Sequence, residues 1–531
     1  MQITKIPFQQ VPMFSDKDVA YATESPKLKP FYKYPVNIES FKEVIEEKKQ
    51  ENIDRETLHR VLRQQYEGLE ITDAVRENID KLKAENTFTI VTAHQPSLFT
   101  GPLYYVYKII STINLVQQLN EYYPDEQFVP IFVSGGEDHD FEEVNHAQVF
   151  SNRVEWNNEE SGSVGMMKTD SLKPVLEELK SILGESDRAV ELYGIIEKAY
   201  TSHERYSQAT QDMVNALFGK YGLVALNMNH PDLKRLFIPI MREEILQQPS
   251  HRLVEATQKE LEKVDFSPQA FAREINLFYL DEQIRERIVL EDGQYKVLNT
   301  DLSFSEVELM DELEKHPEHF SPNVVMRPLF QEVVLPNLAY IGGGGEIAYW
   351  LERKSQFAHF GVKYPMLIRR NSVLWIDKGT HKKMEKLELS LEDLMMDVEE
   401  LIKLYVSRST EKELTLEEEK NQVEAAYEAM TEKAASIDPT LAKAFQAEQT
   451  RQMKSLDQLE SRLMRAEKQR HEVAINQIRS LKDKLFPNNG LQERVDNFMP
   501  FFLQQGWEYF DLLLENLDPL VKAQMVVVTD N

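Results

Sequence analysis

The amino-acid sequence predicts an α/β fold, a parallel sheet with helices around it, followed by a long helical hairpin. Two short runs rich in β-branched and apolar residues, 87–93 (TFTIVTA) and 128–134 (FVPIFVS), flank the helix-like stretch YYVYKIISTINLVQQL. Strand, loop, helix and strand in this order indicate a βαβ unit. Residues 378–487 instead consist largely of Glu, Lys, Gln, Leu and Ala, a composition typical of long helices.

Composition excludes several classes of protein. The 531 residues contain no cysteine, which excludes disulfides, thiolate zinc sites and a cysteine nucleophile. A net charge of -28 argues against nucleic acid as the main partner, because phosphate contacts need clustered Lys and Arg. No apolar run approaches the roughly 20 residues of a membrane span, and MQITKIPFQQVPMF lacks the features of a signal peptide. We therefore expect a cytoplasmic protein that does not enter membranes.

The elements follow in order along the chain. Residues up to about 83 have the three-four apolar spacing of helices, and the two strands of the βαβ unit come next. Stretches of the same kind predict further strands of the sheet at 222–227, around 324–327, and at 339–343 and 366–370. The intervening regions, about 150–215 and 247–320, are interpreted as insertions beside the sheet. The predicted domains are 1–377, the core with these insertions; 378–487, the hairpin; and 488–531, which returns to the core.

The hairpin prediction depends on a helix start in its middle. Asp438 suits an N-cap and Pro439 a first helical position. Before this point apolar residues recur every seven residues, and after it they keep a three-four spacing that polar Arg470 interrupts. We expect an antiparallel coiled-coil hairpin whose second arm, if it is all helical, is about 70 Å long.

Titratable side chains gather at the ends of the first two predicted strands. Glu137, Asp138, His139 and Asp140 follow the second strand, and His94 ends the first. Because ligands of parallel sheets bind beyond the carboxyl ends of the strands, both groups should face one crevice. The acidic quartet has three interpretations: a metal site, a polar cap of a helix starting at Phe141, or a pocket for a substrate amine and hydroxyls. We favour the pocket, because His94 occupies an equivalent strand end.

Three other segments carry candidate site residues. HQPSLFTGP offers His94 and Gln95 as donors and a turn at Thr100-Gly101 before a helix N-terminus that could bind an anion, although the turn could simply start the helix. IGGGGEIAYW places glycines before a helix, so that their N–H groups could face a phosphate or carboxylate. It lacks the patterns of a P-loop and of a dinucleotide fold, and a flexible turn is the alternative. Glu346 after it could bind a ribose or an amine.

Two further groups have equally ordinary alternatives. Arg327 and Gln331 in MRPLFQEVVLP could bind a carboxylate, although a buried salt bridge is the alternative for Arg327. Lys234 in NHPDLKRLF follows a strand end, where a surface lysine is the alternative.

Together these segments resemble one family, the cysteine-adding (BshC) enzymes of bacillithiol biosynthesis. The resemblance is carried by HQPSLFTGPLYYVYK, PIFVSGGEDHDFEEVNH, NHPDLKRLF, INLFYL, RPLFQEVVLPNLAYIGGGGEIAYW and LQER, which span most of the chain in the family's order. Two positions depart from the family pattern. The family commonly has GQQ where this chain has Ala93-His94-Gln95, and a proline where Gly344 stands.

The resemblance implies a Rossmann-like core related to class I aminoacyl-tRNA synthetases and nucleotidyltransferases, with connecting-peptide insertions and a coiled coil that forms a homodimer. It also implies a ligase that joins the carboxyl group of L-cysteine to the amine of glucosaminyl malate. Activating a carboxylate suggests ATP, although no KMSKS-like loop is found. The alternatives are a nucleotidyl or acyl transferase acting on another amino sugar, and a non-enzymatic scaffold built on the hairpin.

With this activity in view, we assign the candidate residues to roles. The catalytic candidates are His94, Asp138 and His139, and no metal ligand is assigned. The substrate-binding candidates are Gln95, Thr100, Gly101, Tyr104, Glu137, Asp140, Asn145, Arg327, Gln331, Glu346 and Tyr349. The nucleotide-binding candidates are Gly342, Gly343, Gly344, Gly345 and Lys234.

Overall fold

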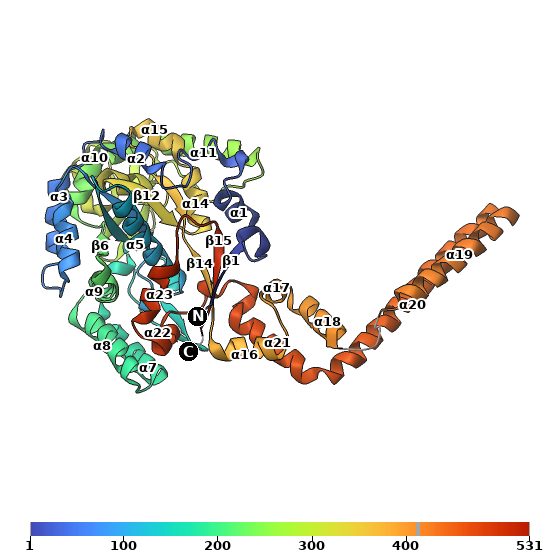
Figure 1. Cartoon of the computed structure of the whole chain (residues 1–531). Helices are drawn as coiled ribbons and strands as arrows, with labels where there is room; N and C mark the ends of the chain where they lie inside the picture. The colour runs from blue at the N-terminus through green and yellow to red at the C-terminus, as the bar shows by residue number, and fades with distance from the viewer. Residues whose placement is uncertain (1, 410–414, 530–531) are drawn as a thin grey trace. The chain divides into compact units, whose positions relative to one another are not determined.

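A computed structural model describes residues 2–409 and 415–529 (Figure 1). The chain folds into two compact units. One unit comprises residues 3–374 and 492–527, and the other comprises 375–491 with the ends of the chain. The C-terminal segment 492–527 thus belongs to the same unit as the N-terminal part of the chain.

The larger unit is built on a five-stranded sheet in the order β13-β12-β2-β3-β6, with every neighbouring pair parallel. Its strands are β2 (Thr87–His94), β3 (Gln127–Ser134), β6 (Val224–Asn227), β12 (Asn337–Gly342) and β13 (Met366–Arg369). Five of the six predicted strands are therefore confirmed. Register places His94 directly opposite Ser134, so that the ends of β2 and β3 are level.

Helices cover both faces of this sheet because the side chains of each strand alternate between two apolar clusters. Ile90 of β2 packs in the cluster that contains Leu115 of α5 (Tyr104–Tyr122), the helix between β2 and β3. Its neighbour Val91 packs in the cluster on the opposite face. That second cluster includes side chains from α3 (Arg55–Gln65), α4 (Asp73–Lys81), α10 (Pro231–Gln247) and α13 (Arg327–Val334).

The strand predicted around 324–327 is wrong. This segment is a turn that leads into α13. The side chain of Asn323 accepts hydrogen bonds from the N–H groups of Val325 and Met326, which closes the turn. Pro328 then lies in the first turn of the helix, where its missing N–H costs nothing.

The two regions interpreted as insertions differ in structure. Residues 277–322 form a second sheet, antiparallel, in the order β10-β9-β8-β7-β11. Its strands are β7 (Leu277–Asp281), β8 (Ile284–Glu291), β9 (Gln294–Val297), β10 (Ser303–Phe304) and β11 (Phe320–Pro322). The earlier region is mainly helical, after a hairpin of β4 (His146–Val149) and β5 (Asn152–Glu155).

The sequence predicted a helical N-terminal segment, but its first element is a strand. It begins with β1 (Gln2–Pro7), which belongs to a three-stranded sheet in the order β1-β15-β14 with β15 (Ala523–Val528) and β14 (Ser372–Ile376). Remaining helices up to the hairpin are α1 (Asp16–Ala22), α2 (Phe41–Lys48), α6 (Phe141–Val144), α7 (Lys173–Leu183), α8 (Asp187–Ser202), α9 (Tyr206–Phe218), α11 (Pro249–Glu262), α12 (Glu306–Lys315), α14 (Gly344–Leu351) and α15 (Lys354–Phe360). The C-terminal segment adds α22 (Met499–Gln505) and α23 (Glu508–Asn516).

The second unit contains the predicted helical hairpin. Its helices are α16 (Lys378–Lys386), α17 (Leu391–Met395), α18 (Val398–Ser409), α19 (Glu417–Ile437), α20 (Pro439–Arg470) and α21 (Glu472–Leu485). α19 and α20 lie side by side (Figure 1), and the side chain of Asp438 caps α20 through the N–H of Thr440, as predicted. The second arm is shorter than expected, about 48 Å at 1.5 Å per residue, because the helix breaks at His471. Residues 410–414 of the predicted hairpin lie outside the described residues.

None of the helices in the described part of the chain is long and apolar enough to cross a membrane.

Candidate functional site

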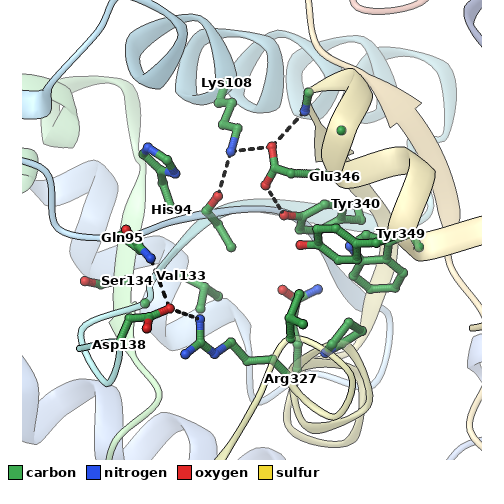
Figure 2. Close-up of a pocket in the computed structure, with 18 of the residues that line it drawn as sticks. His94, Gln95, Lys108, Val133, Ser134, Asp138, Arg327, Tyr340, Glu346 and Tyr349 are labelled. Carbon is green, nitrogen blue, oxygen red and sulfur yellow. Dashed lines mark hydrogen bonds and ion pairs between the residues drawn. The ribbon is translucent and has the colours of Figure 1, made fainter. Parts of the chain in front are cut away.

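A cavity of about 450 Å³ lies at the carboxyl ends of the parallel strands (Figure 2). Because all five strands run the same way, the loops that follow them meet at this edge of the sheet. The cavity is lined by these predicted residues: His94, Gln95, Tyr104, Glu137, Asp138, Arg327, Gln331, Gly343, Gly344, Gly345, Glu346 and Tyr349. The prediction that the ends of the first two strands face one crevice is thus confirmed, whereas the roles assigned to these residues stay predictions.

Asp138 is the centre of a network that joins four separate segments (Figure 2). Its carboxylate accepts a hydrogen bond from Gln95 Nε2 at 3.0 Å and lies 3.5 Å from Arg327 Nη1 and 3.4 Å from Arg285 Nη1. It also accepts from the N–H of His139 at 2.9 Å. Burial alone would raise the pKa of this carboxyl, but Arg327, Arg285 and the hydrogen bonds outweigh burial and hold the pKa far below its ordinary value. Asp138 therefore stays ionised and is a poor proton acceptor.

His94 is fixed within the wall of the cavity. Its ring makes edge contacts with Tyr104 and Tyr105, with ring centroids 5.3 and 5.4 Å apart. Burial lowers the pKa of the imidazole well below its ordinary value, and the positive charges of Lys108 and Arg370 lower it further. Among the described residues, His94 Nε2 is buried without a hydrogen-bond partner. A neutral imidazole with one unused nitrogen is thus present at the cavity.

Lys108 and Glu346 form an ion pair on the same wall (Figure 2). Lys108 Nζ lies 2.5 Å from Glu346 Oε2 and donates to the carbonyl of Ala93 at 3.0 Å. The other carboxylate oxygen of Glu346 accepts from the hydroxyl of Tyr340 at 2.7 Å. Burial lowers the pKa of the Lys108 ammonium, and the adjacent carboxylate opposes this shift. The pair connects α5 to α14 across the end of β2.

Side chains pack closely around the glycine run, and its assignment to a nucleotide stays a prediction. The N–H of Gly343, the residue before α14, donates to the carboxylate of Glu346 at 2.8 Å and is therefore not available to a ligand. A Cβ at Gly344 would overlap the carboxylate of Asp18, which two hydrogen bonds from Arg369 hold in place, each 3.0 Å long. Both carboxylates are paired with cations, Glu346 with Lys108 and Asp18 with Arg369, so they leave no net negative charge at this helix end. The Asp18 carboxylate also leaves no space for a larger residue at position 344, where the family commonly has proline.

Four predicted site residues lie near the cavity but do not line it. His139 is 51% exposed and stays beside Arg285, whose guanidinium stacks on Phe278 4.1 Å away. Asp140 caps α6 by accepting from the N–H of Glu143, which is the helix-cap interpretation of the acidic quartet. The carbonyl of Gly342 accepts from the N–H of Arg370. Buried Asn145 accepts at its carbonyl from the N–H of Trp156.

Lys234 is also buried rather than at the surface. Its ammonium donates to the carbonyl of Glu318 at 3.1 Å and lies 3.2 Å from Glu137 Oε1. It therefore supports an acidic residue of the cavity and is separate from the glycine run, although the sequence suggested that both bind a nucleotide.

Thr100 and Gly101 belong to a strained loop between β2 and α5. Phe99, Thr100 and Gly101 all have positive φ, and a β-branched residue rarely adopts this conformation. Buried Asn497 compensates by donating from Nδ2 to the carbonyls of Phe99 and Gly101, at 2.8 and 2.6 Å. The C-terminal segment thus holds the loop that follows His94 and Gln95.

Comparison with known proteins assigns the family. The model "Bacillithiol biosynthesis BshC, N-terminal Rossmann-like domain" matches residues 1–371, and "Bacillithiol biosynthesis BshC, C-terminal coiled-coil domain" matches residues 373–529. The chain belongs to the BshC family. These two descriptions confirm the Rossmann-like core and the coiled coil that the resemblance implied.

Individual BshC relatives agree over nearly their full length. A protein of Flavobacterium johnsoniae named "Putative cysteine ligase BshC" is 41% identical over 97% of each chain. A protein of the same name from Bacillus cereus is 27% identical, again over 97% of each chain. The solved structure of a Campylobacter jejuni protein titled as an arginyl-tRNA synthetase aligns with 83% of this chain and 96% of that one, at 10% identity and a TM-score of 0.21, which is too low to support an argument.

Sequence reasoning missed several charged residues around the cavity of this BshC chain. Lys108, Glu143, Arg370 and Arg494 line it, and Arg285 reaches it through Asp138. Four of the missed residues had a usable signal: Lys108, Glu143 and Arg494 lie in segments that carry the family resemblance, and Arg370 ends a predicted strand. Arg285 had none, since it lies in the region interpreted as an insertion.

Behind the cavity of this BshC chain, buried Glu332 predicts a pH-dependent stability. It accepts from Asn337 and Gln331 at 2.7 and 2.9 Å and lies 3.5 Å from Lys48 Nζ. Burial raises its pKa to about 7, although Lys48 and the two amides oppose the shift. Above the ordinary glutamate pKa and below 7, the folded chain holds a proton that the unfolded chain has released. The free energy of unfolding should therefore fall as pH rises through this window, by up to about 1.4 kcal/mol per pH unit.

Urea unfolding at pH 5, 6, 7 and 8 measures this effect in the wild type and in Glu332→Gln. The free energy of unfolding of Glu332→Gln should not decline between pH 5 and 7. Exposed Glu282→Gln makes the same change of charge, and its free energy of unfolding should still decline over this range. Equal slopes in the wild type and Glu332→Gln would contradict the assignment.

Proposed function

We propose that this protein is a ligase that joins the carboxyl group of L-cysteine to the amine of glucosaminyl malate, forming the amide bond of bacillithiol. The observation that carries the proposal is one cavity, in a BshC chain, where His94 and Asp138 from two strand ends line the same space. Its volume of about 450 Å³ lies in the range of small-molecule sites.

The chemistry requires an activated carboxyl group. A free carboxylate is a poor electrophile, so the cysteine carboxyl must first carry a leaving group, as in an acyl phosphate or acyl adenylate made from a nucleoside triphosphate. The sugar amine then attacks the carboxyl carbon. The carbon-nitrogen bond forms, the oxygen leaves with its activating group, and the nitrogen loses one proton. We assign no step to the glycine run, because the N–H of Gly343 already donates to Glu346.

The cavity residues divide between the two reactants in this proposal. His94 Nε2 would hydrogen-bond the activated carboxyl group, as a neutral donor does in an oxyanion site, and the support for this role is that Nε2 has no hydrogen-bond partner among the described residues. Asp138 holds the sugar by accepting hydrogen bonds. Glu143, which also lines the cavity, is a better proton acceptor than Asp138, because burial and the nearby charges of Asp140 and Asp138 raise its pKa.

An assay with purified protein tests the function. L-cysteine and glucosaminyl malate are incubated with ATP, with other nucleoside triphosphates, and without nucleotide, and bacillithiol is measured by mass spectrometry. Product above the protein-free control supports the proposal. Absence of product with every nucleotide favours a transferase that acts on another amino sugar, which the same assay tests by replacing the acceptor.

We also propose that the hairpin forms a homodimer. Apolar side chains of Met430, Leu441, Leu459 and Leu463 are exposed on α19 and α20 and have no cover within the described residues. Light scattering at micromolar concentration should give a dimer. Replacing Leu459 and Leu463 by Asp should weaken it by about 30-fold or more, since each leucine is 46% exposed in the single chain and would lose about 1 kcal/mol of further apolar burial. Ser461→Asp between them is the matched control, and a monomeric wild type would contradict the proposal.

A further inference from the structure

Two arginines line the side of the cavity near the end of β13. Arg370 follows this strand and is 3% exposed. Its Nη1 donates to Glu493 Oε1 at 2.8 Å and to the carbonyl of Asn371 at 2.9 Å. Its Nε is buried and has no hydrogen-bond partner in the part of the chain that the structure describes. Arg494 is exposed and lines the same cavity, and no described carboxylate lies within ion-pair distance of it.

The charges around these arginines do not balance. Arg369 pairs with Asp18 and Arg370 with Glu493, whereas Arg494 is left over. Three guanidinium groups against two carboxylates leave one positive charge at this side of the cavity. Lys108 adds no net charge, because it is paired with Glu346. An anion bound here would therefore gain an ion pair without separating one that exists.

The far side of the cavity has three carboxylates and three cations, so its charges balance, but one carboxylate has no described cation within ion-pair distance. Asp138 is paired with Arg327 and Arg285, and Glu137 with Lys234. Glu143 has no cationic partner among the residues described.

Tyr104 connects the two sides. Burial raises the pKa of the Tyr104 hydroxyl to about 12. The charges of Arg370 and Arg494 on one side of the cavity lower this pKa, and those of Glu346 and Glu143 raise it. The cavity thus offers an unpaired cation and an unpaired carboxylate to a single ligand.

We propose that Arg494, together with Arg370, binds a carboxylate of the malate part of the acceptor and so directs its amine toward Glu143. This inference rests on the proposed function, because it names the acceptor of that reaction. Glucosaminyl malate carries carboxylates at one end and an amine at the other, which matches the two unpaired charges. Cysteine fits the arginines less well, because an ion pair there would hold the carboxylate that must be activated and attacked.

Steady-state kinetics of Arg494→Gln test the proposal. The KM for glucosaminyl malate should rise about 10- to 100-fold with kcat nearly unchanged, since a charge-assisted contact is lost from binding alone. The KM for cysteine should not change. An uncharged acceptor, the methyl glycoside of glucosamine, should react equally well with both proteins. The KM of Arg494→Lys for glucosaminyl malate should lie between those of the wild type and Arg494→Gln, because lysine keeps the charge but loses the paired N–H donors of the guanidinium.

Exposed Arg235→Gln makes the same change of net charge away from the cavity and should behave as wild type. Titration calorimetry with glucosaminyl malate alone separates this inference from the proposed function. If the wild type binds this compound more tightly than Arg494→Gln but never forms bacillithiol, the function fails and the subsite stands. Equal affinity of the two proteins, an equal loss with the uncharged acceptor, or a raised KM for cysteine would overturn the inference.

Discussion

His94→Ala is expected to lower kcat for amide formation by about 10²- to 10³-fold, whereas His94→Gln should stay within about tenfold of wild type. The first figure is the usual cost of removing one donor aimed at a developing negative charge. Because burial and two neighbouring cations keep the imidazole neutral, its part is a hydrogen bond rather than a proton relay. A glutamine amide can place a donor near the position of Nε2, and BshC proteins commonly have glutamine here. Product formation by mass spectrometry at saturating substrates measures both variants.

The comparison of these two variants separates two mechanisms. Equal inactivity of His94→Gln and His94→Ala would mean that the imidazole itself moves a proton, and would contradict the hydrogen-bond role. His359→Ala is the matched control, since it removes an imidazole that pairs with Glu243 outside the cavity. Its kcat should equal that of the wild type.

The parallel sheet could be predicted because its strands are short runs of apolar and β-branched residues. β2 and β3 are buried along nearly their whole length, and their sequences contain no Asp, Glu, Lys or Arg. The same reasoning failed around residue 325, where Val324, Val325 and Met326 form an apolar run in a turn. Asn323 before it and Pro328 after it were the contrary signals.

The antiparallel sheet gave a weaker signal. β8 reads IRERIVLE, in which both faces of the strand mix charged and apolar residues, so the alternation typical of a half-buried strand is blurred. Such short, partly exposed strands depend on their neighbours for stability, and sequence periodicity does not report those neighbours. The break of the long helix at His471 was equally hidden, since the surrounding residues are ordinary helix formers.

The site could be predicted only as far as topology alone determines it. His94 and Asp138 were found because the ends of parallel strands must meet at one edge of the sheet. Arg285 comes from the other sheet and Arg494 from the C-terminal segment, so their approach depends on tertiary packing. Tertiary packing also gave two predicted nucleotide-binding groups other neighbours. Lys234 forms an ion pair with Glu137, and the carboxylates of Glu346 and Asp18 lie beside the glycine run.

Asp138→Asn is expected to reduce both activity and stability strongly. Arg285 is 3% exposed at its side chain, and the variant leaves this guanidinium without its carboxylate. Removing one partner of a buried ion pair costs about 3–5 kcal/mol, and partial exposure of Asp138 places the expected loss near the lower value. We expect kcat/KM to fall at least about 100-fold, because the amide has a single, uncharged acceptor oxygen and holds Gln95 and Arg327 less firmly than the carboxylate. Urea unfolding and the bacillithiol assay measure the two effects.

The double variant Asp138→Asn with Arg285→Met decides how the two effects are related. Methionine keeps apolar contact with Phe278 and removes the unpaired charge, so more than half of the lost stability should return. Activity should not return, because the carboxylate that faces the substrate is still absent. Recovery of both would show that Asp138 only neutralises Arg285. Exposed Asp54→Asn is the matched control: it makes the same change at the N-cap of α3 outside the cavity lining, and asparagine caps a helix as well as aspartate does, so stability and activity should stay near wild type.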